Sequence, residues 1–235
     1  MATLFCKTTD EIVKLLDLEK PFQAKIIYQN MIKGIFDFND MKGLTKEMRQ
    51  RLSEDHESAL SSSIIKKYDD DSATKLAIKL EDGSVVECVR LFDGDNRYTA
   101  CISSQVGCAM GCSFCKTGTM GLKRNLNAGE IVEQFAHLKS LGEKISHIVF
   151  MGMGEPLANF QEVMRAVTEF HREDGFNISY RKITISTCGL VPGIKKLTEL
   201  NLPVKLAVSL VSADDATRSK IMKINRTYNL KKLKE

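Results

Sequence analysis

The sequence predicts an α/β protein whose core is a parallel β-sheet. From about residue 98 onward, apolar strand-like runs alternate with segments of helical periodicity. The strand-like runs are residues 98–105, 145–152, 182–187 and 204–211, and the helical segments lie near residues 127–141, 160–172, 191–200 and 213–222. Because crossovers between parallel strands are right-handed, these four βα units are expected to form either a doubly wound sheet or a barrel.

Two shorter parts precede this region. Residues 1–58 show apolar positions three and four apart, interrupted at Pro21, which predicts a small helical domain. Residues 59–96 begin with a polar stretch that is expected to be a linker. They continue as two β-like runs around Asp82-Gly83, a strong hairpin signal. The α/β core is then predicted to span residues 97–235.

Composition and charge narrow the class of protein. Hydrophobic residues make up 43% and charged residues 27%, as in ordinary globular proteins. No apolar run approaches the roughly 18 residues of a membrane helix, and the first residues do not form a secretory signal, so a cytoplasmic protein is expected. The net charge of +4 arises in residues 216–235, which carry seven Lys or Arg and one acid. Overall charge therefore does not establish a nucleic-acid partner.

The cysteines form the sharpest sequence feature. An odd count of seven argues against a disulfide scaffold, and three of them stand close together in Cys108-Ala-Met-Gly-Cys112-Ser-Phe-Cys115, directly after the first strand. One loop can fold three thiolates around one inorganic centre. Three cysteines without a fourth nearby suit a [4Fe–4S] cluster with one open iron, whereas structural zinc normally takes four protein ligands. We favour the cluster and keep zinc as the alternative.

Further candidates follow the next three predicted strands. Gly152-Met153-Gly154-Glu155-Pro156 follows the second, Ser186 closes the third, and Ser209-Leu210-Val211 closes the fourth. Glycine lets the backbone approach a ligand, and a carboxylate can accept hydrogen bonds from an ammonium group or a ribose. Ligands of such folds bind at the carboxyl ends of the strands. A plain loop and solvated strand ends are the alternative interpretation.

The cysteine spacing, with Phe114 before the last cysteine, resembles that of the radical S-adenosylmethionine (SAM) enzymes. The resemblance implies a partial (βα)6-type barrel, of which about four βα units are present here. It also implies that Cys108, Cys112 and Cys115 bind a [4Fe–4S] cluster whose open iron binds SAM. The residues that would line SAM are Gly154, Glu155, Ser186, Ser209, Leu210 and Val211. In that superfamily the reduced cluster cleaves SAM to a 5′-deoxyadenosyl radical.

Surrounding motifs narrow the resemblance to one family. These motifs are Cys101-Ile-Ser-Ser-Gln105-Val-Gly-Cys108, Met120-Gly121, Arg124-Asn125-Leu126 and Ala128-Gly129-Glu130-Ile131. They resemble the adenine-C2 RNA methyltransferases of the RlmN type, whose small N-terminal helical domain helps to bind RNA. The resemblance implies methylation of C2 of an adenine in 23S rRNA, with tRNA as a further candidate, through a methyl-cysteine intermediate. An external electron donor is implied as well.

Two more residues take roles from this resemblance. Glu87 matches the family's proposed general base, and Cys101 matches the cysteine that forms a disulfide to release the product. From the residues alone, Glu87 is an exposed strand glutamate and Cys101 a small buried strand residue. Cys6, Cys88 and Cys188 receive no role and are expected to be packing residues.

The sequence also departs from the family pattern. Val211 stands where many members have histidine, and Lys223 where proline is usual. The family continues past position 235, and no cysteine here matches the one that carries the methyl group. We therefore expect the coding sequence to be incomplete. We expect this chain to bind the cluster but not to catalyse the reaction. C8 methylation of the adenine and a non-catalytic RNA-binding relative stay open as alternatives.

Overall fold

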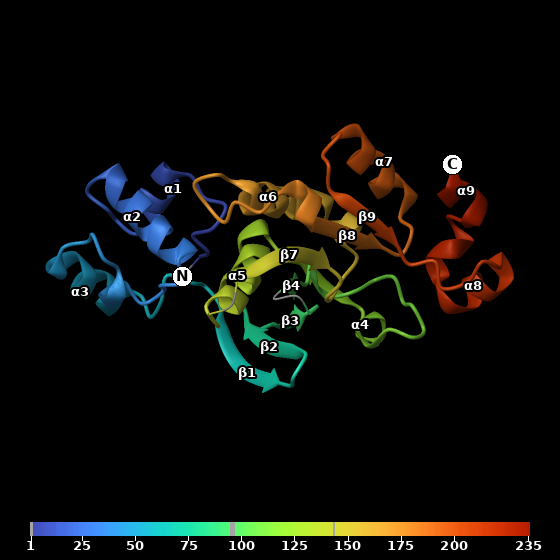
Figure 1. Cartoon of the computed structure of the whole chain (residues 1–235), viewed down its shortest axis with the longest axis horizontal. Helices are drawn as coiled ribbons and strands as arrows, with labels where there is room; N and C mark the ends of the chain where they lie inside the picture. The colour runs from blue at the N-terminus through green and yellow to red at the C-terminus, as the bar shows by residue number, and fades with distance from the viewer. Residues whose placement is uncertain (1, 95–96, 143) are drawn as a thin grey trace.

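The computed structural model describes residues 2–94, 97–142 and 144–235, and these form a mixed sheet flanked by helices (Figure 1). In the sheet the strands follow the order β1-β2-β3-β4-β7-β8-β9. Their bounds are β1 Ser63–Asp69, β2 Ala73–Lys79, β3 Val85–Phe92, β4 Tyr98–Cys101, β7 Ile145–Phe150, β8 Ile183–Thr187 and β9 Lys205–Val208. A separate pair consists of β5 Gln105–Gly107 and β6 Leu122–Asn125.

Helices connect and flank these strands. Their bounds are α1 Thr9–Leu15, α2 Pro21–Ile32, α3 Lys46–Asp55, α4 Lys116–Thr119, α5 Ala128–Lys139, α6 Phe160–His171, α7 Val191–Glu199, α8 Asp215–Ile221 and α9 Leu230–Lys234. The helices α1–α3 lie at one end of the molecule, and α8 and α9 lie at the other (Figure 1). Among the described residues, none of these helices has both the length and the apolar character needed to cross a membrane.

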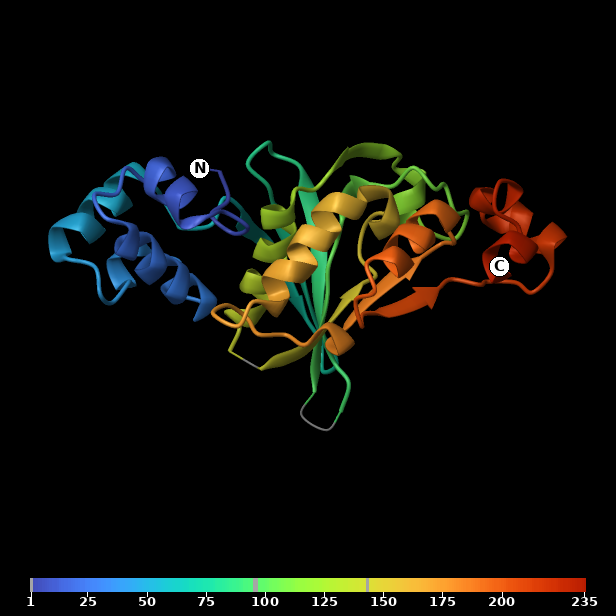
Figure 2. The same cartoon turned by 90° about the horizontal axis from the view of Figure 1, so that it is seen from above.

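The parallel half of the sheet confirms the predicted α/β fold. β4, β7, β8 and β9 pair in parallel, and α5, α6 and α7 lie together on one side of them (Figure 2). Local sequence sets where the helices begin. Asn127, for example, caps α5 by accepting from the Glu130 amide, while the Glu130 carboxylate accepts from the Asn127 amide. The sheet is open at both edges in the described residues, so the structure shows no closed barrel.

The antiparallel half is larger than the sequence indicated. The hairpin β2–β3 forms as predicted, with its turn at Gly83, whose φ is +78°. Residues 63–69, expected to be a linker, instead form β1, an edge strand paired with β2. All seven residues of β1 are exposed, so the strand shows no alternation of buried and exposed residues. Its pairing with β2 holds it in place, which a sequence pattern does not reveal.

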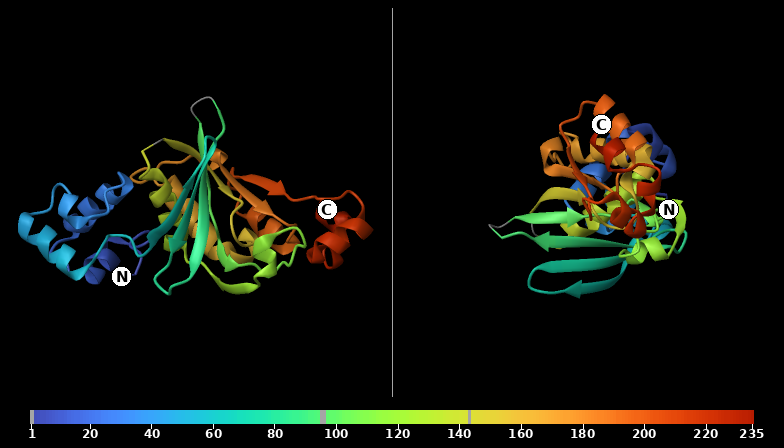
Figure 3. Two further views of the ribbon diagram at one scale, coloured as in Figure 1. Left: turned by 90° about the horizontal axis from the view of Figure 1, so that it is seen from below. Right: turned by 90° about the vertical axis from the view of Figure 1, so that its right-hand side faces the viewer.

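The two faces of the sheet differ. Along β2, Leu76 and Ile78 are buried toward the helices, while Lys75 and Ala77 point to the other side. Figure 3 shows β1–β4 from the side that helices α5 and α6 do not cover. We call this uncovered side the open face.

One register row crosses the open face. Tyr68 of β1 lies opposite Lys75 of β2, Lys75 opposite Val89 of β3, and Val89 opposite Cys101 of β4. Side chains directly opposite one another project from the same face of a sheet. The row therefore runs from the β1 edge to one of the predicted site residues.

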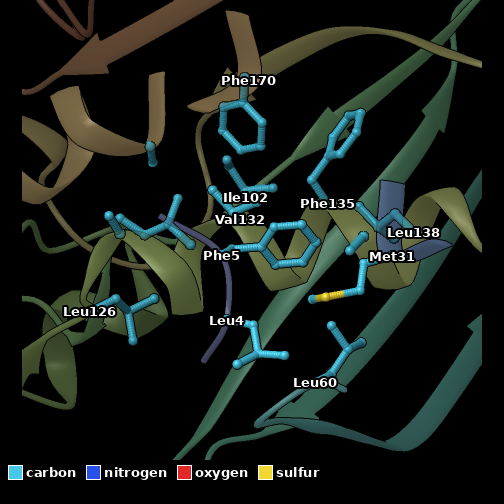
Figure 4. Packing of buried hydrophobic residues seen from close by; sticks show 14 of the residues in the cluster. Leu4, Phe5, Met31, Leu60, Ile102, Leu126, Val132, Phe135, Leu138 and Phe170 are labelled. Atoms are coloured by element: carbon cyan, nitrogen blue, oxygen red, sulfur yellow. The ribbon is translucent and has the colours of Figure 1, made fainter. Parts of the chain in front are cut away.

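The N-terminal helices share one hydrophobic core with the sheet. Leu4 and Phe5 are fully buried, and Phe5 lies near Phe135 of α5 in the core that also contains Phe170 of α6 (Figure 4). The Tyr28 hydroxyl of α2 donates to the Glu169 carboxylate of α6 over 2.7 Å. A division of the chain after residues 58 and 96 stays a prediction, and residues 95–96 at the second boundary lie outside the described part.

Candidate metal and cofactor site

The three-cysteine loop is framed by the β5–β6 pair. The Cys108 amide donates to the Gly121 carbonyl over 2.9 Å, which closes the loop at its base. Gly107 precedes it with φ +78°, a conformation that favours glycine. Inside the loop, the Cys115 amide donates to the Cys112 carbonyl over 3.1 Å, a tight turn that brings the last two cysteines together.

The C-terminal segment packs against this loop. The Ser113 amide donates to the Ile221 carbonyl over 3.0 Å, and Met222 is buried with Cys112 and Cys188 in a small apolar cluster. A side chain at Gly111 would place its Cβ 3.3 Å from the Lys223 ammonium nitrogen. Lys223 thus lies along the cysteine loop, so its replacement of the usual proline affects more than a local turn.

The three predicted ligands are electrostatically coupled. Burial raises the pKa of the Cys108 thiol, and the nearby Glu155 and Cys115 raise it further. Burial also raises the pKa of the Cys112 thiol, with Cys108 and Cys115 adding to the effect. These like charges disfavour the metal-free thiolates, and a cationic centre would relieve that repulsion.

The donor set fits an iron–sulfur cluster with one open iron. Across residues 2–94, 97–142 and 144–235, no three His, Cys, Asp or Glu side chains are placed so that they could hold a metal ion. Three thiols from one loop are nevertheless the donors that such a cluster takes from protein. A closed structural zinc site would require a fourth protein ligand, whereas the cysteine motif supplies three.

Glu155 connects the cysteine loop with two strand ends. Its side chain is only 3% exposed, and its carboxylate accepts from the amides of Leu157 (3.1 Å) and Cys188 (2.8 Å). Its own amide donates to the Gln105 side chain over 2.9 Å. A carboxylate has about four acceptor positions, so two amides leave capacity for a ligand's ammonium group. The structure thus gives Glu155 a role in tying β7 to β8 that the sequence did not indicate.

Gly154 is required by packing within the protein. Its φ is +103°, and an added Cβ would lie 2.6 Å from the Gln105 Cβ and 2.8 Å from the Gln105 amide nitrogen. The loop after β7 therefore packs directly on the segment before the cysteines. Close approach of Gln105 explains this glycine, and its role beside a cofactor stays a prediction.

Arg218 organises the predicted serine strand ends. Its guanidinium is fully buried and donates to the carbonyls of Cys188 (2.7 Å), Leu210 (3.0 Å) and Ser209 (3.3 Å). Ser186 lies in β8, and the Ser209 amide donates to the Thr187 carbonyl, which places both serines at adjacent strand ends. No sequence pattern points to Arg218, because a basic residue in a short helix normally faces solvent.

Val211 adopts a strained backbone at this strand end. Its φ is +63°, and the Ser212 amide donates to the Leu210 carbonyl over 2.7 Å, as in a γ-turn centred on Val211. A β-branched residue is disfavoured in this left-handed region. The position at which many family members carry histidine is therefore one that valine fits poorly.

Val211→Asn is expected to stabilise the protein by about 1 kcal/mol, because asparagine tolerates a positive φ better than valine does. Val211 is largely exposed, so little buried area is lost. Urea unfolding measures the change. Val208→Asn, at an exposed position in ordinary strand conformation, is the control and is expected to give no gain. A destabilised Val211→Asn variant would contradict the assignment of strain.

Glu87 and Cys101 project from the open face. Cys88, between Glu87 and Val89, points to the helices, since its sulfur lies 3.8 Å from the Gln134 carbonyl of α5. Glu87 therefore points the opposite way, as does Val89, the partner of Cys101. The Glu87 carboxylate pairs with the Lys75 ammonium at 3.1 Å. Burial raises the pKa of the Cys101 thiol, and a hydrogen bond from the Met151 amide partly offsets that effect.

Arg124 ties the Glu87 hairpin to the frame of the cysteine loop. It lies in β6 and donates to both Glu130 carboxylate oxygens, each over 2.8 Å, and to Asp82 in the hairpin turn over 2.9 Å. The Arg124 guanidinium holds the pKa of the Asp82 carboxyl well below its usual range. The motif residue Arg124 thus fixes the hairpin against the start of α5.

A buried network of hydrogen bonds around the Gln134 amide supports the same region, and no sequence pattern predicted it. The Gln134 side chain of α5 accepts from the Ser103 amide (2.8 Å) and donates to the Ser103 carbonyl (3.0 Å). The Ser103 hydroxyl donates to the Glu87 carbonyl (2.6 Å) and accepts from the Met153 amide (2.8 Å). The only sequence feature that indicates this network is the presence of polar residues among the apolar positions of α5.

Gln134→Leu is expected to destabilise the fold by about 2–3 kcal/mol, because it leaves the buried Ser103 amide and carbonyl without partners. Gln161→Leu, on the exposed side of α6, serves as the control and is expected to change stability by less than about 0.5 kcal/mol. Chemical denaturation of both variants measures the difference. Equal effects would show that the network contributes nothing specific.

Comparison with known proteins supports the prediction of a radical SAM protein. Residues 102–235 match the model of the Radical SAM superfamily. A probable dual-specificity RNA methyltransferase RlmN from Carboxydothermus hydrogenoformans is 46% identical over 96% of this chain and 67% of its own length. The dual-specificity RNA methyltransferase RlmN of Wolinella succinogenes is 38% identical over 98% of this chain and 68% of its own.

The chain belongs to the RlmN-type family of radical SAM proteins. The resemblance carried by its motifs is thereby confirmed. A crystal structure of a radical SAM methyltransferase from Sphaerobacter thermophilus superposes with a TM-score of 0.87 and 37% identity, covering 99% of this chain and 70% of that one. A further RlmN relative from Rhodopirellula baltica is 44% identical, and this chain spans 58% of its length.

Proposed function

We propose that the protein is a radical SAM methyltransferase that methylates C2 of an adenine in 23S rRNA and in tRNA. One observation carries the proposal: the cysteine loop, Glu155, and the hairpin bearing Glu87 are joined into one assembly by Arg124, Gln105 and Ser103. Curated relatives named as dual-specificity RNA methyltransferases support it.

The proposed target explains the need for an unusual site. Adenine C2 is an electron-poor carbon, so it does not attack the methyl group of a sulfonium. A bound cluster and SAM would supply the one-electron chemistry that overcomes this. Cys108, Cys112 and Cys115 would hold the cluster. Glu155 would accept hydrogen bonds from SAM, and Gly154, Ser186 and the Ser209–Val211 strand end would line it.

Glu87 and Cys101 would act on the RNA side of the reaction. The half-exposed Glu87 carboxylate is accessible from the open face and would accept the C2 proton. Cys101 would form a disulfide with a methyl-carrying cysteine, for which no residue of this sequence is assigned, as the S–C bond between that cysteine and the methylated base breaks. Lys75 holds the Glu87 carboxylate in position at 3.1 Å.

Expression of the complete source gene in a bacterium without its own adenine-C2 methyltransferase tests the proposal. Nucleosides from 23S rRNA and from tRNA are analysed separately by mass spectrometry. 2-Methyladenosine is expected in both, and a Glu87→Gln variant should lose it. 8-Methyladenosine would instead assign the C8 reaction, and unmodified adenosine in both RNAs would contradict a methyltransferase.

A further inference from the structure

An exposed tyrosine with two lysines stands at the β1 edge of the open face. Tyr68 is 46% exposed, in a strand whose seven residues are all exposed, so the side chain is not part of the core. The Lys66 ammonium lies 4.6 Å from the centre of the Tyr68 ring, and the Lys75 ammonium lies 5.1 Å from it. Two ammonium groups thus lie over the ring of one exposed tyrosine.

The register row places this group near the proposed chemistry. Tyr68, Lys75, Val89 and Cys101 lie opposite one another across four neighbouring strands. Neighbouring strands are about 4.8 Å apart, so Tyr68 lies about 14 Å from Cys101. Lys75 also pairs with Glu87 at 3.1 Å and therefore links the aromatic ring to the proposed base.

We propose that Tyr68, Lys66 and Lys75 form a subsite for one nucleotide of single-stranded RNA that flanks the target adenine. The base stacks on the Tyr68 ring, and a neighbouring phosphate contacts the two ammonium groups. This subsite rests on the proposed function and specifies how the RNA lies on the open face. Base stacking on aromatic side chains with basic residues along the backbone is how proteins bind single-stranded RNA.

The same edge is unsuited to a protein strand. The pairing of β1 with β2 is interrupted between Ile64 and Lys66, and Lys66 and Lys67 follow at once. Irregular pairing and lysines are devices by which sheets prevent strand addition at an edge. Lys67 pairs with Asp69 and Lys75 with Glu87, while the Lys66 ammonium lies over the exposed ring and complements a nucleic acid. We therefore assign the surface to RNA.

Tryptophan fluorescence tests the subsite directly. The chain contains no tryptophan, so Tyr68→Trp introduces a single reporter at the subsite. Titration with a single-stranded RNA oligonucleotide should quench this fluorescence. Phe92→Trp provides a matched reporter, because Phe92 is 41% exposed and projects from the opposite face of the sheet to Val89, so it is expected to be unaffected.

The affinity for RNA and the salt dependence of that affinity distinguish the contribution of base stacking from that of the charged side chains. Binding is followed by the anisotropy of labelled RNA. Tyr68→Leu should weaken binding at least about 5-fold, and Tyr68→Phe should retain most of the affinity. Lys66→Ala should lower the slope of log K against log salt by about 0.7, the value for one phosphate contact on a single strand. If Tyr68 had a purely structural role, Tyr68→Leu would lower stability and leave the affinity of the folded protein for RNA unaltered.

The outcomes distinguish the subsite from the function on which it rests. If RNA binds but neither quenches the Trp reporter nor responds to Tyr68→Leu, the subsite is wrong while RNA binding stands. If no RNA binds at all, both the subsite and the proposed function are contradicted. Quenching by a β-strand peptide and not by RNA would assign the edge to a protein partner and overturn the proposal.

Discussion

Cys112→Ala is expected to abolish iron–sulfur cluster binding completely. Two remaining thiolates do not hold a cluster that takes three ligands from this loop. After anaerobic reconstitution with iron and sulfide, the wild-type chain should contain about four irons per chain and absorb visible light, and the variant should do neither. Any activity that depends on the cluster should disappear with it.

Cys188→Ala provides the matched control for this prediction. Cys112 and Cys188 are both 8% exposed and pack with Met222 in the same apolar cluster, so their substitutions remove similar buried groups. Only Cys112 belongs to the three-cysteine motif. Cluster loss in Cys188→Ala with retention in Cys112→Ala would contradict the ligand assignment. Zinc rather than iron in the wild-type chain would favour the structural zinc alternative.

Gly107→Ala is expected to destabilise the fold by about 3–5 kcal/mol and to prevent cluster assembly. An added Cβ would lie 1.8 Å from the Gly121 carbonyl oxygen, which already accepts from the Cys108 amide. Because both atoms belong to the base of the cysteine loop, relief of the clash must displace the loop. The β5–β6 frame would open at the first predicted ligand.

Gly83→Ala isolates the contribution of that contact. Gly83 and Gly107 both have φ +78°, but an added Cβ at Gly83 meets no atom within 4 Å. Gly83→Ala is expected to cost about 1–2 kcal/mol from backbone strain alone and to leave the cluster intact. Denaturation curves and iron content of both variants provide the comparison. Equal losses would show that the approach of Gly107 to Gly121 is not critical.

Much of the fold was predictable because its signals are local. The parallel strands are apolar runs, and the hairpin turn is announced by Asp82-Gly83. β1 was missed because an edge strand exposed along its whole length has no alternation to detect. Its existence depends on hydrogen bonds to β2, which the sequence of β1 does not encode by itself.

The candidate site also contains residues that local sequence signals predict and residues that they do not. Cys108, Cys112 and Cys115 are predicted as ligands because their spacing alone indicates a shared centre, and Glu87 and Cys101 are predicted through the family resemblance; these roles stay predictions. Arg218 and Gln134 were not found, since their importance lies in burial and in carbonyl partners far away in the sequence. Such partners become visible only when the strand ends are placed beside the helices.

Electron paramagnetic resonance of the reconstituted, reduced chain with and without SAM tests whether the cysteine loop holds a cluster that binds SAM. The wild-type chain should give the signal of a reduced [4Fe–4S] cluster, and addition of SAM should change that signal because SAM binds the open iron. Cys112→Ala should give no cluster signal under either condition. A chain that forms no cluster, or a cluster signal that SAM leaves unchanged, would contradict the assignment of this loop as a radical SAM site.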